Sequence, residues 1–204
     1  MKLYYAPGVC SLAVHIALRE AGIPHTLEKV DLATKQTASG DDFNRVNPLG
    51  YVPALELNTG EVLLEAPAIL QYLADQKPDA GLAPAAGTIE RARLQQHLNF
   101  TASELHKAFG PFFAAVKPEG AQREQALSKL HSRMDRLDAI LRDGRNFLMG
   151  SDFSIADTYA FVVASWSGPV GLDLGQWPHI AAYVDRVRQR PHVQEAMRRE
   201  ELPH

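Results

Sequence analysis

Cys10 is the only cysteine of the 204-residue chain and lies in Pro7-Gly8-Val9-Cys10-Ser11. This segment joins a strand expected at residues 2–5 to a helix expected at residues 11–21. Free backbone N–H groups and the dipole at a helix N-terminus favour negative charge, so a thiolate would be stabilised there. We predict a reactive Cys10 whose pKa is lowered from near 8.5 into the range of about 3.5 to 7.5. The alternatives are a buried structural cysteine and, for the neighbouring Ser11, either a second reactive hydroxyl or a simple helix cap.

A second candidate segment is Asn47-Pro48-Leu49-Gly50-Tyr51-Val52-Pro53, which stands just before an expected hairpin. A cis bond before Pro53 would leave the N–H and C=O of Val52 free to pair with an extended peptide. The alternative is a trans bond, with Pro53 simply starting a strand.

Glu65 and Ala66 directly precede a helix expected to begin near Pro67. The Ala66 N–H at a helix N-terminus and the Glu65 carboxylate together offer what an α-amino acid head group needs. The alternative is that Glu65 only stabilises the start of the helix.

Asn99, Ser103 and His106 fall at positions i, i+4 and i+7 of an expected long helix and form a polar face beside its apolar stripe. The imidazole of His106 could serve a cleft wall as an acid, a base or a hydrogen-bonding group. The alternative is a solvated face, which the neighbouring Glu104 and Lys107 favour.

Several other chemistries lack their motifs. The eight histidines never form His-Glu-x-x-His, no cysteine pair exists for zinc, and neither a Walker loop nor Gly-x-Gly-x-x-Gly occurs. With 24 acidic and 21 basic residues the formal charge is −3, which gives no positive field for a phosphate backbone. We therefore expect no metal, nucleotide or nucleic acid partner.

The sequence also shows no pattern typical of a membrane-spanning segment or of a signal peptide. No apolar run is long enough to span a bilayer, and the N-terminal residues resemble a strand rather than a signal peptide. A lone cysteine excludes an internal disulfide and favours a reducing compartment.

The elements that must position these residues alternate in the first third of the chain. Apolar periodicity and turn residues predict the order β-α-β-α-β-β-α. The hairpin turns at Asn58-Thr59-Gly60. The elements expected in this part of the chain include strands at 2–5, 26–30, 54–57 and 61–64 and helices at 11–21 and 67–76. Parallel strands joined by a crossover, followed by an antiparallel hairpin, imply a mixed sheet with helices on its faces.

The later part of the chain has only helical periodicity. A stretch rich in proline and glycine predicts a linker at 78–87, between a first domain at 1–77 and a second at 88–204. Apolar residues at helical spacing predict a long helix closed by Pro118 and Gly120, and two further helices. The stripe residues of the three are Leu94, Leu98, Leu105, Phe109, Phe112 and Val116; Leu127, Leu130, Met134, Leu137 and Leu141; and Ile180, Val184 and Val187. Ser154 and Asp157 have capping-box spacing and predict the start of a central helix.

Taken together, five segments resemble the beta class of bacterial glutathione S-transferases, with matching order and spacing. They are MKLYYAPGVCSLAVHIALREAG, DLATKQTASGDDF, NPLGYVPALEL, EAPAILQYLAD and LNFTASELHKAF, and the FSIADTY segment adds to them. The resemblance implies an α/β plus all-α fold, in which a thioredoxin-like N-terminal domain precedes a C-terminal helical bundle domain.

The resemblance also implies a set of site residues. Catalysis would involve Cys10, beside the glutathione sulfur and able to form a mixed disulfide with it, Ser11, supporting the thiolate, and His106. Glutathione would be bound as co-substrate, with no metal, by Cys10, Lys35 at the glycyl carboxylate, Val52 before a cis Pro53, Glu65 and Ala66 at the γ-glutamyl end, and a wall of Asn99, Ser103, Glu104, Leu105 and His106. A cytoplasmic homodimer with a role in detoxification is implied as well, with Glu104 contributing to the neighbouring subunit's site.

Two positions depart from the family pattern. Tyr51 replaces the usual glutamine before Val52, so its bulk can alter glutathione contacts or occupy part of the acceptor pocket. Ala66 followed by Pro67 replaces the more usual start of that helix, and the hydroxyl contact of a serine is lost.

Three functions fit these residues. The leading hypothesis is a glutathione S-transferase that conjugates reduced glutathione to electrophilic hydrophobic substrates. The first alternative is glutathione-dependent disulfide or peroxide reduction, or dehalogenation, in which Cys10 itself reacts. The second is a non-catalytic hydrophobic-ligand or interaction protein on the same scaffold.

Overall fold

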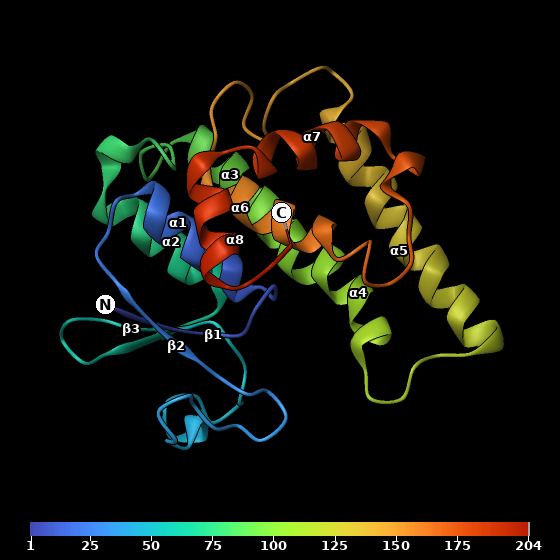
Figure 1. Cartoon of the computed structure of the whole chain (residues 1–204). Coiled ribbons are helices and arrows are strands. Elements are labelled where there is room, and N and C mark those ends of the chain that lie inside the picture. Colours follow the sequence, from blue (N-terminus) through green and yellow to red (C-terminus); the bar gives the residue numbers. More distant parts are fainter. Residues whose placement is uncertain (204) are drawn as a thin grey trace. The chain divides into compact units, whose positions relative to one another are not determined.

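The structure, a computed structural model, describes residues 1–203 of the chain (Figure 1). The chain forms two compact units. The first comprises Met1–Ala83 together with a segment that begins at Gln189, and the second is Pro84–Arg188.

A four-stranded mixed sheet forms the centre of the first unit. Its strands are β1 (Lys2–Tyr5), β2 (Thr26–Lys29), β3 (Ala54–Glu56) and β4 (Val62–Leu64), in the order β2-β1-β3-β4. β1 runs parallel to β2 and antiparallel to β3, which pairs antiparallel with β4. The predicted mixed sheet is therefore confirmed.

Helices α1 (Ser11–Glu20) and α2 (Ala66–Gln76) lie on the same side of this sheet (Figure 1). On β1, Tyr4 packs against Phe43, with ring centroids 5.5 Å apart. Phe43 belongs to η1 (Phe43–Arg45), a single 3-10 turn. The sequence predicted a helix between β2 and β3, and this was wrong: η1 is short, and Pro48 prevents it from continuing.

The last helix of the chain packs against the first one. α8 (Pro191–Arg199) lies beside α1 (Figure 1). Just before it, the Arg190 guanidinium donates to both carboxylate oxygens of Glu20, at 2.7 and 2.8 Å. The sequence predicted that this helix belongs to the second domain, at 88–204, whereas it belongs to the first unit. Apolar periodicity shows which face of a helix is buried but not which other helix packs against it.

The second unit is helical. Its helices are α3 (Ile89–Phe100), α4 (His106–Phe113), α5 (Gly120–Leu141), α6 (Ile155–Ser165) and α7 (Pro178–Arg188). A π-helical turn, η3 (Thr101–Leu105), joins α3 to α4 without a break in the helical backbone. The three helical stripes seen in the sequence thus correspond to observed helices.

Two details of the expected long helix are wrong. Val116 is 87% exposed and lies beyond the end of α4, where Ala114 turns to an extended conformation. Gly120 does not close the long helix but is the first residue of α5.

The predicted capping box at the start of α6 is present. The Asp157 carboxylate is fully buried and accepts hydrogen bonds from the Ser154 N–H at 2.8 Å and the Leu148 N–H at 2.8 Å. It also accepts from the Tyr183 hydroxyl at 3.1 Å. Burial raises the pKa of Asp157 to about 6, although these hydrogen bonds favour the charged form. The box therefore ties α6 to α7 and to the preceding loop.

Among the residues described, no helix combines the length and apolar character needed to cross a bilayer.

Candidate functional site

Cys10 caps the N-terminus of α1 and is partly buried. Its thiol donates a hydrogen bond to the carbonyl oxygen of Val52 at 3.1 Å. The Val52–Pro53 peptide bond is cis, as the family resemblance implied. The loop that follows β1 and carries the thiol thus meets the turn that precedes β3 at one end of the sheet.

The structure opposes the predicted low pKa of Cys10. Burial raises the pKa of its thiol to about 12, and the backbone amides at the start of α1 offset only part of this effect. The negative charge of Glu65 raises the pKa further. The rule that helix N-termini activate thiols fails here, because burial disfavours the thiolate more strongly than the helix N-terminus favours it.

Ser11 has a structural role in this loop. Its side chain is fully buried, and its hydroxyl donates to the Ala6 carbonyl at 3.1 Å and accepts from the Ala6 N–H at 3.2 Å. With both functions engaged, the hydroxyl holds the loop before Cys10. This differs from the expected support of a thiolate.

Lys35 adopts a left-handed conformation, with φ of 61°. Its ammonium group donates to the Gly50 carbonyl at 3.0 Å and lies 5.9 Å from the ring centroid of Tyr51. Tyr51, which replaces the glutamine of the family pattern, is 67% exposed. The Lys35 side chain therefore crosses the segment that leads to Val52.

Glu65, whose charge acts on the Cys10 thiol, also has a positive φ, of 68°. It occupies the N-cap position of α2, yet its exposed carboxylate makes no capping hydrogen bond. Ala66, which follows, is buried as the first residue of the helix. A non-glycine residue in this conformation costs about 1 kcal/mol or more, and such strain concentrates at functional sites.

These residues form a site with three parts in the first unit. A cation, Lys35, lies beside the segment before the cis bond, and the backbone of Val52 contacts Cys10. Glu65 and the N-terminus of α2 supply a carboxylate and free N–H groups. An extended peptide with a carboxylate at one end and an α-amino acid group at the other matches this distribution of charge.

In the second unit, His106 belongs to an aromatic group. Its Nδ1 lies 2.8 Å from the Tyr159 hydroxyl, and its ring packs edge-on against Trp166 with centroids 4.7 Å apart. Phe109 and Phe113 pack edge-on against the same indole, at 5.8 and 5.6 Å. The sequence did not identify Tyr159 or Trp166 as partners of His106, because neither lies near it in the chain.

Burial lowers the pKa of His106 to about 4, and the nearby charge of Lys107 contributes in the same direction. The imidazole is therefore neutral near pH 7. It can make hydrogen bonds but carries no positive charge there.

The other residues predicted to form a wall of the site differ in their burial and in their contacts. The Ser103 hydroxyl donates to the Asn99 carbonyl at 2.8 Å, so these two exposed residues share one helix face as predicted. Leu105 is fully buried, so its side chain belongs to the core rather than to a wall. The Glu104 carboxylate pairs with Arg133 of the same chain at 2.7 Å, and its role in a neighbouring subunit's site stays a prediction. Three of these residues lie in the π-helical turn, a feature frequent at functional sites.

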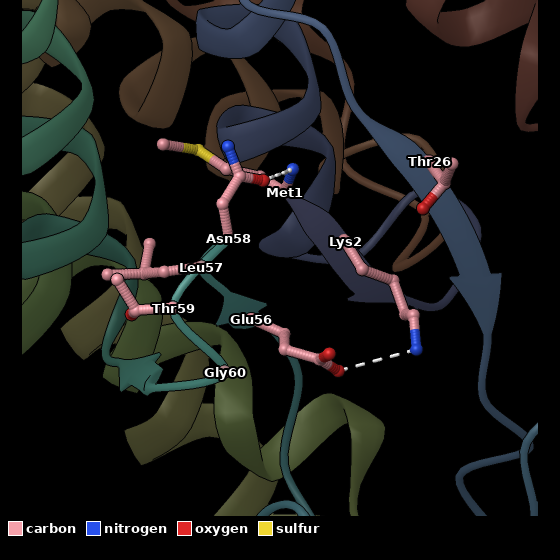
Figure 2. Close-up of a pocket in the computed structure, with 8 residues that line it drawn as sticks. All are labelled: Met1, Lys2, Thr26, Glu56, Leu57, Asn58, Thr59 and Gly60. Carbon is pink, nitrogen blue, oxygen red and sulfur yellow. Dashed lines mark hydrogen bonds and ion pairs between the residues drawn. The ribbon is translucent and has the colours of Figure 1, made fainter.

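A shallow hollow lies at the opposite end of the sheet (Figure 2). It is lined by residues at the N-terminal ends of β1 and β2 and in the β3–β4 turn. The Met1 amine donates to Asn58 Oδ1 at 2.6 Å, and Lys2 pairs with Glu56 at 3.3 Å. With its charges paired in this way, the hollow lacks the features of the Cys10 site.

The part of the chain that the structure describes contains no cluster of three or more side chains able to hold a metal ion. The fold defines a class of protein in which a thioredoxin-like unit, which carries Cys10 and the cis Val52–Pro53 bond, is followed in the chain by a helical unit.

Comparison with known proteins agrees with this class. Residues 8–76 match the N-terminal domain of glutathione S-transferase, and residues 100–191 match its C-terminal domain. The chain is 44% identical to glutathione S-transferase GstA of Escherichia coli O157:H7, over 99% of this chain and 100% of that protein.

Solved structures give the same result. A beta-class glutathione S-transferase of Sphingomonas chungbukensis is 49% identical, with a TM-score of 0.95 and full coverage of both chains. A sphingomonad glutathione S-transferase in complex with glutathione is 46% identical, with a TM-score of 0.94 and full coverage of both chains. The chain belongs to the glutathione S-transferase family, and the resemblance to its bacterial beta class is confirmed. It is a glutathione transferase with glutathione as its co-substrate.

Proposed function

We propose that the site around Cys10 binds glutathione in an extended conformation. Lys35 pairs with the glycyl carboxylate, and the backbone of Val52 pairs with the cysteinyl residue. Glu65 and the Ala66 N–H bind the γ-glutamyl end. The observation that carries this proposal concerns two oppositely charged residues with positive φ, Lys35 and Glu65. Lys35 bonds to Gly50 before the cis bond, and the charge of Glu65 acts on Cys10, whose thiol contacts Val52.

We propose that the reaction at this site is transfer of the glutathione sulfur to an electrophilic carbon. The thiol of glutathione loses its proton to solvent, and its sulfur forms a bond to the carbon while the leaving group departs with the electron pair of its bond. Cys10 lies beside the reacting sulfur and does not supply it. A disulfide exchange through Cys10 requires its thiolate, which the raised pKa disfavours.

Side chains of the helical unit indicate which kind of acceptor the protein uses. Trp166, Phe109 and Phe113 give an aromatic group next to the neutral imidazole of His106. Phe113 is 51% exposed, which leaves apolar surface for a ligand. We infer an acceptor with a hydrophobic body, while His106 acts as a hydrogen-bonding group rather than as a cation.

A cytoplasmic homodimer that removes toxic electrophiles is the wider proposal. Leu49 and Tyr51 are each 67% exposed in the segment before Val52, an unusual position for large apolar groups that a second subunit would cover. A free cysteine suits a reducing compartment. Equilibrium sedimentation gives the mass of two chains if this proposal is right, and of one chain if it is wrong.

The proposed reaction is tested by assaying wild type and Cys10→Ala for two activities: conjugation of glutathione to 1-chloro-2,4-dinitrobenzene, and glutathione-dependent disulfide reduction. Conjugation should persist in the variant, because glutathione supplies the attacking sulfur. Loss of conjugation together with loss of disulfide reduction would show instead that Cys10 carries the chemistry.

A further inference from the structure

The carboxylate of Glu200 joins two parts of the first unit that are distant in the sequence. One oxygen accepts a hydrogen bond from the Gly8 N–H at 3.0 Å, and the other lies 2.9 Å from Nδ1 of His15. The side chains of Glu200 and His15 are both fully buried. Gly8 precedes Cys10 by two residues and His15 follows it by five, so this one group links the Cys10 loop to the interior of α1.

The end of α8 brings Glu200 to this position. The Glu201 N–H donates to the Arg198 carbonyl at 3.1 Å, and the Leu202 N–H donates to the Met197 carbonyl at 3.0 Å. These two bonds are those of a Schellman motif, in which the first residue after the cap is left-handed and usually glycine. Glu201 holds that conformation with φ of 58° despite its side chain. It is the third non-glycine residue with positive φ among residues 1–203, and the other two are Lys35 and Glu65.

Leu202 adds an apolar contact at the same point. A Cβ atom placed on Gly8 would lie 3.2 Å from Leu202 Cδ2, and Gly8 is itself left-handed with φ of 72°. Only glycine fits there without strain. The segment after α8 therefore covers the Cys10 loop with one hydrogen bond and one close apolar contact.

The stability of the fold alone does not explain a buried carboxylate at position 200. A buried carboxylate that is hydrogen-bonded to a histidine often contributes little net stability, because the desolvation of both polar groups offsets their attraction. His15 Nε2 is also buried without a hydrogen-bond partner in the described structure. An apolar pair would fill such a space at lower cost, but it could not hold the Gly8 N–H.

We propose that Glu200 is a positioning residue for the Cys10 loop. Through Gly8 it fixes the backbone that places the Cys10 thiol against Val52, at the proposed glutathione site. This inference rests on the proposed glutathione site. Its primary test, the reactivity of Cys10 without glutathione, does not depend on that site.

The chain offers a matched set of variants. Glu200→Ala removes the Gly8 and His15 contacts together. Glu200→Gln keeps an oxygen for the Gly8 N–H and turns its amide toward His15, whose Nδ1 can accept as the other tautomer. Glu20→Ala is the control, because Glu20 is a largely buried carboxylate that ties α1 to Arg190 at the end of the helix away from Cys10.

The alkylation rate of Cys10 by iodoacetamide at one fixed pH, followed by intact mass, is the first readout. Glu200→Ala should increase it about tenfold, because a lost buried hydrogen bond frees the loop, and should raise KM for glutathione by a similar factor. Glu200→Gln should stay within about twofold of wild type. Glu20→Ala should lower Tm and leave both quantities unchanged.

Equal acceleration by Glu200→Ala and Glu20→Ala for the same loss in Tm would overturn the proposal, as would a folded Glu200→Ala with wild-type alkylation. If Glu200→Ala does not fold, Leu202→Ala gives a second test. It removes only the apolar cover of Gly8 and should accelerate alkylation to a smaller extent. No acceleration in a folded Leu202→Ala protein would then count against the proposal. A change in KM without a change in alkylation would also overturn the proposal, because it would place the effect on glutathione contacts rather than on the loop.

Discussion

The Cys10 thiol donates a hydrogen bond to the Val52 carbonyl oxygen across 3.1 Å. This contact joins the N-terminus of α1 to the cis peptide bond before β3. A thiol that donates a hydrogen bond and is largely withdrawn from water keeps its proton, and this agrees with the raised pKa of Cys10.

The titration of Cys10 follows from this contact. In the free protein, the alkylation rate of Cys10 should stay low through pH 8.5 and rise only at higher pH, because the thiolate is the nucleophile. Intact-mass spectrometry over a pH series measures the rate, with free glutathione as the reference thiol. A rate that reaches its plateau below pH 8.5 would show that the helix N-terminus outweighs burial after all.

The two charged ends of the site should contribute to glutathione affinity. Lys35→Met and Glu65→Gln should each raise Kd about tenfold, because each removes a charge-assisted contact to one end of the tripeptide. Glu61→Gln is the matched control, since Glu61 is an exposed carboxylate in the β3–β4 hairpin. Equal affinities for all three variants and wild type would remove Lys35 and Glu65 from the site.

The capping box of α6 should dominate the stability of the second unit. Asp157→Ala should cost about 3 kcal/mol or more, because it leaves several buried donors without an acceptor. Asp157→Asn, which keeps one acceptor oxygen, should cost less. Urea denaturation measures both, with the exposed Asp152→Ala as control. A loss in Asp157→Ala no larger than in Asp152→Ala would contradict the role of the box.

His106 should make the stability of the protein depend on pH. Its pKa is about 4 in the folded state, below the ordinary value of 6.5, so the unfolded chain binds a proton first as pH falls. The stabilising effect is complete above pH 6.5 and is lost as pH falls toward 4. The difference in Tm between wild type and His106→Gln should therefore be larger at pH 7.5 than at pH 4.5. A difference independent of pH would indicate that the folded-state pKa of His106 is not lowered.

Local signals in the sequence predicted much of the fold. Strand β1 and helices α1 and α2 follow from short apolar patterns and turn residues. The capping box of α6 depends on neighbouring residues, so it too could be predicted. The residues around Pro53 left a cis and a trans bond open, and only the family resemblance implied the cis bond that is observed. The helix expected between β2 and β3 failed, because the order was inferred without an apolar stripe to support it.

The site was harder to predict, because parts of it depend on contacts that leave no local trace. Glu200 and Gly8 are 192 positions apart, and Trp166 meets His106 only after the helices pack. The pKa of Cys10 was predicted in the wrong direction for the same reason. A helix N-terminus can be read from the sequence, whereas the burial that outweighs it results from the folded chain.

Glutathione binding to the Cys10 site is the central claim, and isothermal titration calorimetry of the wild-type protein with reduced glutathione tests it most directly. The structure predicts a saturable heat with one glutathione per chain, and the same ligand should raise Tm because it binds only the folded state. A folded protein that shows no saturable heat up to millimolar glutathione would contradict this claim.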